Sequence, residues 1–369
     1  MIRTTFFSIA IALSILLNFT DTAFGQSLDL VDVFSRGDDG YHTYRIPAIV
    51  CTKQGTLLAF SEGRKDNGSD HGDIDLVLKR SSDNGKTWNE QTLVYEEGDT
   101  KKITIGNPCP VVDQQTGHIH MVFNRDNRSV LVTHSEDDGK TWSKPRDITS
   151  TTKLKDWDWY ATGPGNGIQL TQGPNAGRLV MPCDHRVTPN GTAWKQAGRS
   201  HIIYSDDHGK TWELGGVTDW AMNESAVAEM ENGDLLLNMR SYRELGQRGI
   251  TFSKNSGKSW GPTRNDATLI ESVCQGSFIK YNPPGNNTRS WYLFSNPATT
   301  KGRHHMTVRL SIDDAQTWSH SRLIYEKSAA YSNLVQLPNG NVGILFERDG
   351  YAKISFTQFS IDWIKGTEK

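Results

Sequence analysis

The chain has 369 residues, and its 40 Lys and Arg residues nearly balance its 42 Asp and Glu residues, leaving a formal net charge of −2. A near-neutral chain without a block of like charges is unlike the strongly basic proteins that bind nucleic acids or acidic membrane surfaces. Eleven Trp and 34 Gly residues favour many short strands joined by turns over a few long helices.

The first 25 residues have the pattern of a secretion signal. Arg3 precedes an apolar run, and Ala23 and Gly25 then supply the small residues that a signal peptidase requires. We expect cleavage after Gly25, so that 1–25 is a signal peptide and 26–369 is the mature, secreted or periplasmic domain; the alternative is an uncleaved anchor. No second hydrophobic span follows, so no transmembrane segment is expected in the mature protein.

Short strand patterns then recur along the chain in sets of four. The first strands of six such sets are found at 44–50, 107–113, 165–170, 224–230, 275–281 and 331–337. A second strand, usually led by Gly, follows each of them, as in GTLLAF (55–60). An alternating third strand such as IDLVLKR (74–80) comes next, and most sets end with a fourth strand such as TLVYE (92–96). Units of this size are typical of propeller blades.

The last set lacks a fourth strand, whereas the pattern LDLVDVF (28–34) precedes the first set without a partner. We expect this N-terminal strand to complete the last set, because closing the ring removes exposed sheet edges. The sequence therefore predicts an all-β fold, a six-bladed β-propeller with four antiparallel strands per blade and an N-terminal strand that closes the last blade.

An eight-residue motif, SxDxGxTW, lies between the third and fourth strands. It occurs at 81–88, 135–142, 205–212, 253–260 and 311–318. In such a turn the Asp accepts backbone N–H groups, the Gly adopts a left-handed backbone and the Trp packs between sheets. Two copies deviate, with Asn255 in place of the Asp and Ala315 in place of the Gly. A structural turn tolerates such changes better than a catalytic motif, so we interpret the motif as architecture.

Strand direction places the loops that carry polar side chains on the face opposite these motifs. The inner strands begin on that face with Arg45, Asn107, Glu224, Gln275 and Tyr331. The second strands end there, or continue into loops, with Arg64, Asp70, Arg125, Arg240 and Arg303. Several arginines with a few carboxylates and a tyrosine around one axis predict a cationic pocket for a carboxylate ligand.

The combination of YRIP in the first set, the repeated SxDxGxTW motifs and NESAVAE (223–229) resembles the exo-sialidases (neuraminidases) of the bacterial and animal type. The likeness covers essentially the whole mature chain. It implies that Arg45, Arg240 and Arg303 form the arginine triad that binds the carboxylate of sialic acid. Arg309 is near Arg303 in the sequence but falls in the middle of a strand pattern. For any one arginine, the alternative is a solvated surface side chain.

The same resemblance implies that Tyr331 is the nucleophile and Glu224 its partner. Sialic acid carries a carboxylate on its anomeric carbon, so an Asp or Glu nucleophile would meet like-charge repulsion. A phenol arrives neutral and is activated by a neighbouring carboxylate base. The alternative for this pair is a structural Tyr that is hydrogen-bonded to a Glu.

Asp70 is the candidate general acid and base, in the loop SEGRKDNGSDHGDID (61–75). The family pattern favours Asp70 over Asp66 as the acid. The alternative interpretation of Asp66 is a solvated loop residue. Arg64 matches an additional family arginine that supports the carboxylate and the acid, and its alternative is a structural ion pair with a loop Asp. The segment DWDWY (156–160) is either an aromatic rim for the substrate or an ordinary packed loop.

No cofactor and no metal site are expected. The cysteines Cys51, Cys109, Cys183 and Cys274 lack CxxC spacing, and three follow strand patterns, so we expect buried free thiols. The turn GDDG (37–40) lacks the ligand spacing of a calcium site, which favours a solvated turn.

The resemblance implies retaining hydrolysis of terminal α-ketosidically linked sialic acids. The expected partners are sialylated glycans on glycoproteins, glycolipids and oligosaccharides, and a monomer is expected. Two alternatives remain: a trans-sialidase or intramolecular trans-sialidase, which would share the catalytic residues, and a non-catalytic propeller that only binds sialic acid.

Overall fold

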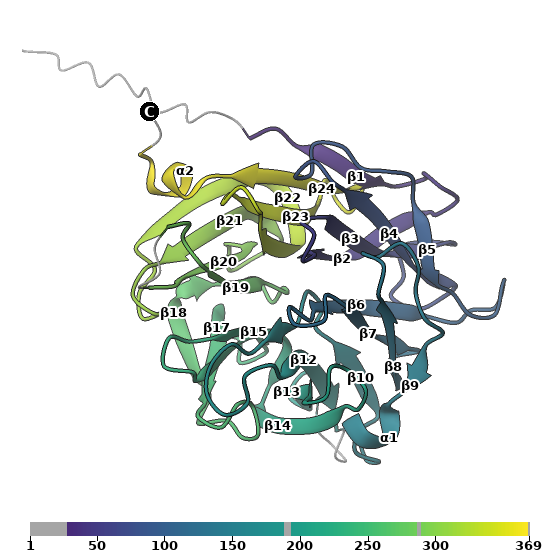
Figure 1. Ribbon diagram of the computed structural model, residues 1–369, viewed down its shortest axis with the longest axis horizontal. Coiled ribbons are helices and arrows are strands. Elements are labelled where there is room, and N and C mark those ends of the chain that lie inside the picture. The colour runs from purple at the N-terminus through teal and green to yellow at the C-terminus, as the bar shows by residue number, and fades with distance from the viewer. Residues whose placement is uncertain (1–27, 188–192, 286–288, 368–369) are drawn as a thin grey trace, which may run out of the picture.

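The structure is a computed structural model that describes residues 28–187, 193–285 and 289–367. The predicted signal peptide at 1–25 therefore lies outside the described residues. The chain is almost entirely β-structure, and its sheets are arranged around a central axis like the blades of a propeller (Figure 1). All strand pairs inside the sheets are antiparallel, as the repeated strand–turn–strand pattern predicts.

Four sheets follow one another along the first two thirds of the chain. The first contains β2 (Thr43–Cys51), β3 (Leu57–Arg64), β4 (Ile74–Ser81) and β5 (Thr92–Tyr95). The second contains β6 (Ile105–Val112), β7 (Ile119–Arg125), β8 (Ser129–Ser135) and β9 (Arg146–Asp147). The third contains β10 (Trp159–Thr162), β11 (Ile168–Gln169), β12 (Leu179–Arg186), β13 (Gly198–Ser205) and β14 (Glu213–Trp220). The fourth contains β15 (Met222–Glu229), β16 (Leu235–Ser241), β17 (Gln247–Ser253) and β18 (Arg264–Ile270).

The inner strand of the third sheet differs from the prediction. The sequence pattern suggests one strand at 165–170, whereas the structure has only β11 there and adds β10 before it, and both pair with β12. The reason lies in Gly163, Pro164 and Gly165, which interrupt the strand between β10 and β11. As a result, Trp159 and Tyr160 from the segment DWDWY belong to a strand.

The rest of the chain forms one seven-stranded sheet rather than two separate ones. Its strands, in order, are β19 (Ser277–Tyr281), β20 (Trp291–Pro297), β21 (His304–Ser311), β22 (His320–Gln336), β23 (Val342–Arg348), β24 (Lys353–Phe359) and β1 (Val31–Ser35). The long strand β22 joins two halves, because its first part pairs with β21 and its last part, from Ala329, pairs with β23. The N-terminal strand β1 pairs with β24, which is the pairing expected from the sequence.

Apolar side chains fill the spaces between neighbouring sheets. Phe60 of the first sheet and Phe123 of the second belong to one buried cluster. Leu345 and Phe356 of the seven-stranded sheet share another cluster with Leu57 of the first sheet. The first and last parts of the chain are thus held together by a hydrophobic core as well as by the β1–β24 pairing, and the ring is closed.

The repeated motif forms the turn between third and fourth strands. At 135–142, Asp137 accepts the backbone N–H of Thr141 at 2.9 Å, and Gly139 has a φ of 78°. Trp142 packs edge-on against Phe60 of the neighbouring sheet, with ring centroids 5.7 Å apart. These contacts support the prediction that the motif is architectural.

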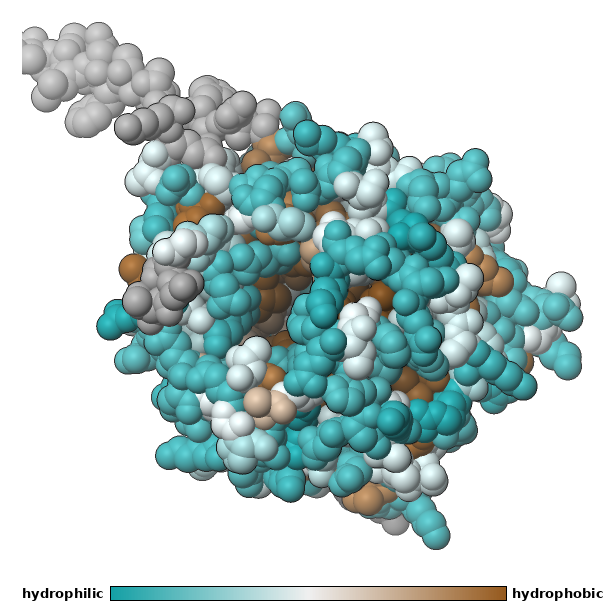
Figure 2. Space-filling view, in the orientation of Figure 1, coloured by the Kyte–Doolittle hydropathy of each residue, from teal (hydrophilic) through white to brown (hydrophobic). Residues whose placement is uncertain are grey.

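The surface is mostly hydrophilic on the face seen in Figure 2, with a hollow near its centre where hydrophobic residues are visible. The described helices, α1 (Thr149–Thr152) and α2 (Ile361–Lys365), have four and five residues. In the described part of the chain, therefore, no helix has the length and apolar character to cross a bilayer. All four cysteines are free, as predicted, and three are buried while Cys51 is half-buried.

Candidate active site

A cavity of about 480 Å³ lies where the inner strands begin and the second strands end. The residues predicted as catalytic or substrate-binding come from separate sheets, yet all of them line this cavity: Asp70, Glu224, Tyr331, Arg45, Arg64, Arg240 and Arg303. Most of the remaining lining is polar or aromatic. The tertiary structure thus brings together side chains that are up to 286 positions apart in the sequence.

β-Bulges shape the inner strands at this end. The pairing register shifts between Arg45 and Ala48 in β2, between Met222 and Ser225 in β15, and between Ala329 and Ser332 in β22. A bulge changes the direction in which nearby side chains point and is common beside active sites. Arg45, Glu224 and Tyr331 lie at or inside these bulges, which explains how regular strands present them to the cavity.

Tyr331 and Glu224 are directly hydrogen-bonded. The Tyr331 hydroxyl donates to Oε1 of Glu224. Arg240 Nη1 donates to the other carboxylate oxygen, Oε2, at 2.7 Å and to the Tyr331 hydroxyl at 3.2 Å. The tyrosine, the carboxylate and the arginine therefore form one small network, whose members come from two different sheets.

The Tyr331 phenol is neutral near pH 7. Burial raises the pKa of Tyr331 well above its ordinary value, and the charge of Glu224 raises it further, while Arg240 and Arg303 lower it by less. A neutral phenol is a weak nucleophile, so a tyrosine can act in that role only if a base takes its proton. Glu224 is the group positioned to accept that proton.

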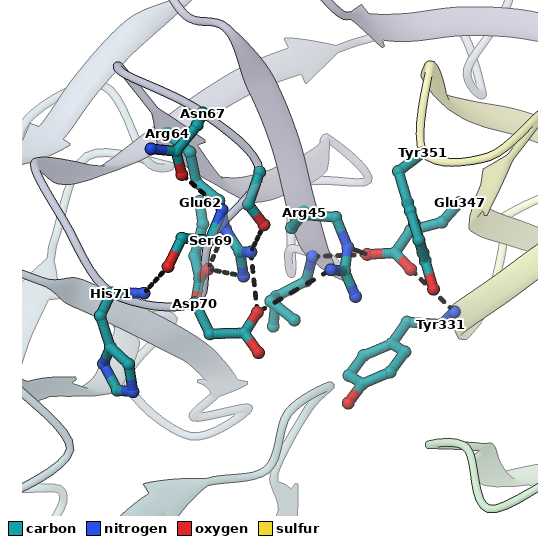
Figure 3. Close-up of polar contacts among 12 residues, drawn as sticks. Arg45, Glu62, Arg64, Asn67, Ser69, Asp70, His71, Tyr331, Glu347 and Tyr351 are labelled. Atoms are coloured by element: carbon teal, nitrogen blue, oxygen red, sulfur yellow. Dashed lines mark hydrogen bonds and ion pairs between the residues drawn. The ribbon is translucent and has the colours of Figure 1, made fainter.

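Arg45 is held in place by a buried glutamate that the sequence analysis missed. Glu347, at the end of β23, accepts hydrogen bonds from Arg45 Nε at 2.7 Å and from the backbone N–H of Ile46 at 2.9 Å. It also accepts the backbone N–H of Tyr331 at 3.1 Å (Figure 3). Ile46 has a φ of 60°, a strained value for a β-branched residue. Glu347 therefore stabilises the bend that carries Arg45 and fixes the backbone of Tyr331.

Asp70 lies between two arginines (Figure 3). Its Oδ1 accepts from Arg64 Nη1 at 2.8 Å and is 3.9 Å from Arg45 Nη1. Partial burial raises the pKa of Asp70, but the charges of Arg64 and Arg45 outweigh it, so the pKa is below its ordinary value. The Asp70 side chain is 75% exposed, which leaves it accessible from the cavity.

Arg64 is almost fully buried and has a positioning role. It donates to Glu62 Oε2 from Nε at 3.0 Å and from Nη2 at 2.7 Å, and to the backbone carbonyl of Gly68 at 2.7 Å. Glu62 Oε1 also accepts the backbone N–H of Asn107 in the next sheet at 2.9 Å. Glu62, like Glu347, was not predicted. The available signal was its place near the end of a second strand, the slot that also supplies Arg64 and Arg240.

Arg303 lines the cavity just before β21. It donates to the Tyr351 hydroxyl and to the backbone carbonyl of Val273, both at 3.2 Å. Its guanidinium carbon is 5.5 Å from the centre of the Tyr331 ring, as is that of Arg45. Among the described residues, no carboxylate lies within ion-pair distance of Arg303, so its charge is available to a ligand.

Some candidates do not reach the cavity. Gln275 is buried and donates to the carbonyls of Pro164 and Ser332, at 3.1 and 3.0 Å. Arg125 forms an ion pair with Glu97 at 2.9 Å, outside the cavity lining. The alternatives Asp66 and Arg309 do not line the cavity either. Arg309 is buried in β21 and donates to Asn296.

The segment 156–160 contributes to both predicted roles. Trp157 is buried and stacks on His185, with ring centroids 3.4 Å apart, so it belongs to the packed interior. Trp159 lines the cavity, together with Arg186 and Trp194. The guanidinium of Arg186 lies over the Trp159 ring at 4.2 Å and over the Trp194 ring at 4.4 Å. The aromatic rim is therefore made by one residue of this segment and by a neighbouring loop.

Comparisons with known proteins show which proteins this chain is similar to. A family model described as a BNR repeat-like domain matches residues 55–344. A protein named Sialidase from Micromonospora viridifaciens is 33% identical over 91% of this chain, which spans 54% of that protein's length. Sialidase-2 of Cricetulus griseus is 33% identical over 89% of this chain and 94% of its own length. The solved structure of Hadza microbial sialidase Hz136 is 30% identical, with a TM-score of 0.82 over 91% of this chain and 69% of that one.

Proposed function

This chain belongs to the sialidase family, and we propose that it is an exo-α-sialidase, a glycoside hydrolase that releases terminal α-ketosidically linked sialic acids from glycans. The observation that carries the proposal is the hydrogen bond between Tyr331 and Glu224, in a cavity that also contains Arg45, Arg240 and Arg303. Cationic side chains around a nucleophile–base pair suit a sugar that carries a carboxylate beside its reacting carbon.

The arginines bind the substrate carboxylate in this scheme. Arg303 has no carboxylate partner among the described residues. Arg45 contacts Glu347 and, at 3.9 Å, Asp70, and Arg240 contacts Glu224, but both arginines keep further N–H groups. Guanidinium groups bind carboxylates through paired, charge-assisted hydrogen bonds. An anion held by all three would place the anomeric carbon near the hydroxyl of Tyr331, because both Arg45 and Arg303 pack over the Tyr331 ring.

Tyr331 then attacks the anomeric carbon while Glu224 takes its proton. The bond from Tyr331 Oη to the sugar forms as the bond to the leaving oxygen breaks, which gives a covalent glycosyl–enzyme intermediate. Water hydrolyses this intermediate in a second displacement, so the configuration at the anomeric carbon is retained. Every group in this scheme is a side chain of the protein or water, and no cofactor takes part.

Asp70 protonates the leaving oxygen and later deprotonates the attacking water. In the free protein the pKa of Asp70 is lowered by Arg64 and Arg45, which favours the ionised form. A substrate carboxylate that binds Arg45 offsets part of this positive charge, and it therefore raises the pKa of Asp70 toward the protonated form. Substrate binding and protonation of the acid are coupled in this proposal.

We also propose six blades and export of the protein. The six-bladed arrangement is supported by the two halves of β22, which pair with different strands on either side of Ala329. A bend there would divide the seven-stranded sheet into two four-stranded blades that share one chain segment. Export is supported by the pattern of the first 25 residues alone, and a monomer also stays a prediction.

The test is release of 4-methylumbelliferone from its α-N-acetylneuraminide, with the sialic acid product followed by NMR. We expect release, with the α-anomer of the free sugar as the first product. A β-anomer as the first product would refute the retaining mechanism. Binding of sialic acid without release from this donor or from sialyllactose would refute the hydrolase and leave a sialic-acid-binding propeller. Formation of a 2,7-anhydro or transferred product would instead identify a trans-sialidase.

A further inference from the structure

Arg186 is a cavity-lining cation that the scheme above does not use. It ends β12 in the third sheet, where its guanidinium packs over the rings of Trp159 and Trp194. These contacts hold a flexible side chain in one place without neutralising its charge. The N–H groups of a guanidinium point outwards in its own plane, so an arginine stacked on indole rings still presents donors to a ligand.

Arg186 is also unpaired. Five arginines line the cavity, and three of them hold carboxylates: Arg45 pairs with Glu347, Arg64 with Glu62 and Asp70, and Arg240 with Glu224. Arg303 and Arg186 are the other two, and Arg303 is already assigned to the carboxylate of the sugar that is cleaved. Among the described residues, no side chain accepts a hydrogen bond from the guanidinium of Arg186, and its Nε is buried without a partner.

A buried acid two positions earlier in the sequence forms no ion pair with Arg186. Asp184, two residues before Arg186, is fully buried and accepts a hydrogen bond from the side chain of Asn223. Burial raises the pKa of Asp184 well above its ordinary value, and the charge of Glu224 raises it further, against smaller opposite effects of Arg186 and Arg240. The protonated form of Asp184 is therefore favoured, and no ion pair joins Arg186 to a carboxylate among the described residues.

The position of Arg186 indicates which part of a substrate it meets. The third sheet contributes none of the groups assigned to the sugar carboxylate, the nucleophile or the acid. Trp194 is 49% exposed, so this wall of the cavity extends to the protein surface. An exo-acting enzyme encloses only the terminal sugar, and the rest of the glycan leaves through the mouth. Arg186 lines the same wall and packs on Trp194, so its guanidinium can reach the sugar residue next to the one that is released.

We propose that Arg186, held by Trp159 and Trp194, forms a subsite for a second carboxylate on the sugar next to the cleaved sialic acid. The preferred substrates are then glycans that end in two linked sialic acids, rather than glycans whose penultimate sugar is neutral. This inference rests on the proposed exo-sialidase function. The chemistry is that of a guanidinium donating two parallel hydrogen bonds to a carboxylate, beside indole rings that exclude water.

The test compares initial rates on α2,8-linked disialyllactose and on sialyllactose for the wild type, Arg186→Gln and Arg186→Lys. We expect Arg186→Gln to lower kcat/KM on the disialyl substrate about tenfold or more, the loss typical of a charge-assisted hydrogen bond. On sialyllactose and on the 4-methylumbelliferyl donor, which carry no second carboxylate, Arg186→Gln should change kcat/KM by less than about threefold. On the disialyl substrate, kcat/KM of Arg186→Lys should lie between the values of the wild type and Arg186→Gln, because lysine keeps the charge but lacks the planar pair of donors.

Arg199→Gln is the matched control. Arg199 belongs to the same sheet and packs over Trp220 at 4.7 Å, but it does not line the cavity. Its replacement removes the same charge and should leave both rates unchanged. Equal losses on both substrates in Arg186→Gln, or no loss on either, would overturn the subsite. A wild type that releases sialic acid from no donor would instead refute the proposed function.

Salt dependence gives a test that needs no variant. The preference of the wild type for the disialyl substrate should shrink as ionic strength rises from about 0.01 to about 1 M, where the Debye length falls from about 30 to about 3 Å. A preference that salt does not change would point to stacking of a neutral sugar face on Trp194 and would overturn the inference. This measurement decides the question if Arg186→Gln does not fold.

Discussion

The Tyr331 hydroxyl donates a hydrogen bond to Glu224, a residue 107 positions earlier in the chain and in a different sheet. The same glutamate accepts from Arg240 at 2.7 Å, so its two oxygens are oriented by two neighbours. In this arrangement Glu224 can take the phenol proton, while the arginine offsets the negative charge that builds on the tyrosine oxygen.

Removing either member of this pair should abolish catalysis with little effect on folding. We expect Tyr331→Phe and Glu224→Gln each to lower kcat by about 10²–10⁴-fold on the 4-methylumbelliferyl donor, the range for loss of a proton-transfer or nucleophilic group. Tyr281→Phe is the control, because it removes a buried phenol hydroxyl that donates to Gly340 at 2.7 Å, outside the cavity. Activity of Tyr331→Phe close to that of wild type would rule out the tyrosine nucleophile.

Asp70→Asn should separate good from poor leaving groups. We expect near-wild-type release of 4-methylumbelliferone, which leaves without a proton, but a loss of about 10²-fold or more on sialyllactose, which requires one. Steady-state rates on the two substrates check this prediction. Asp66→Asn is the matched control in the same loop, and a loss confined to that variant would transfer the acid role to Asp66.

The pH dependence should follow the lowered pKa of Asp70. The pH dependence of kcat/KM reports the ionisation of the free enzyme. In the free enzyme the pKa of Asp70 lies below its ordinary value of about 3.9, so the protonated fraction of Asp70 declines as the pH rises. We therefore expect kcat/KM on sialyllactose to fall from about pH 4 towards pH 8, with a shallower fall for the activated donor. Superimposable profiles for the two donors would contradict an acid role for Asp70.

Arg303 and Arg309 should behave oppositely. We expect Arg303→Gln to weaken binding of free sialic acid by about 10–100-fold, the loss typical of one charge-assisted hydrogen-bond pair, as measured by calorimetry. Arg309→Gln should leave affinity unchanged and lower the melting temperature instead, because Arg309 donates inside the sheet to Asn296 at 3.1 Å. The reverse result would assign the substrate carboxylate to Arg309.

Buried histidines should make the fold acid-sensitive. Burial lowers the pKa of His120 to about 4 and that of His185 to about 3. Below pH 6.5 the unfolded chain binds protons that the folded chain does not, so stability falls as the pH drops towards these values. Each histidine should lower the free energy of unfolding by about 2 kcal/mol between pH 7 and pH 5.

Denaturant unfolding at the two pH values measures this effect. His120→Gln should remove about half of the pH dependence that the two histidines cause. Equal stability of the wild type at pH 7 and pH 5 would show that these histidines accept protons in the folded state.

The sequence alone determined the repeating strands and the turn motif, because these depend on alternation and turn chemistry within short stretches. It also determined the pairing of β1 with β24, because that pairing completes the last set of strands and removes exposed sheet edges. It also placed polar residues at strand ends, and the family resemblance then selected seven of them. Two finer outcomes were not predicted. The break between β10 and β11 follows from Gly163, Pro164 and Gly165, whereas the unbroken course of β22 through two halves of a sheet depends on how neighbouring strands compete for hydrogen bonds.

Only the tertiary structure revealed what holds the candidate site together. Glu347 contacts Arg45 across 302 positions of sequence, and no periodicity connects two such residues. The unpaired guanidinium of Arg186 is likewise a property of its surroundings: two indole rings pack against it, the pKa of the buried Asp184 is raised, and no described carboxylate forms an ion pair with it. Sequence patterns report which side chains face inward, whereas charge balance and pKa depend on distances that exist only after the ring has closed.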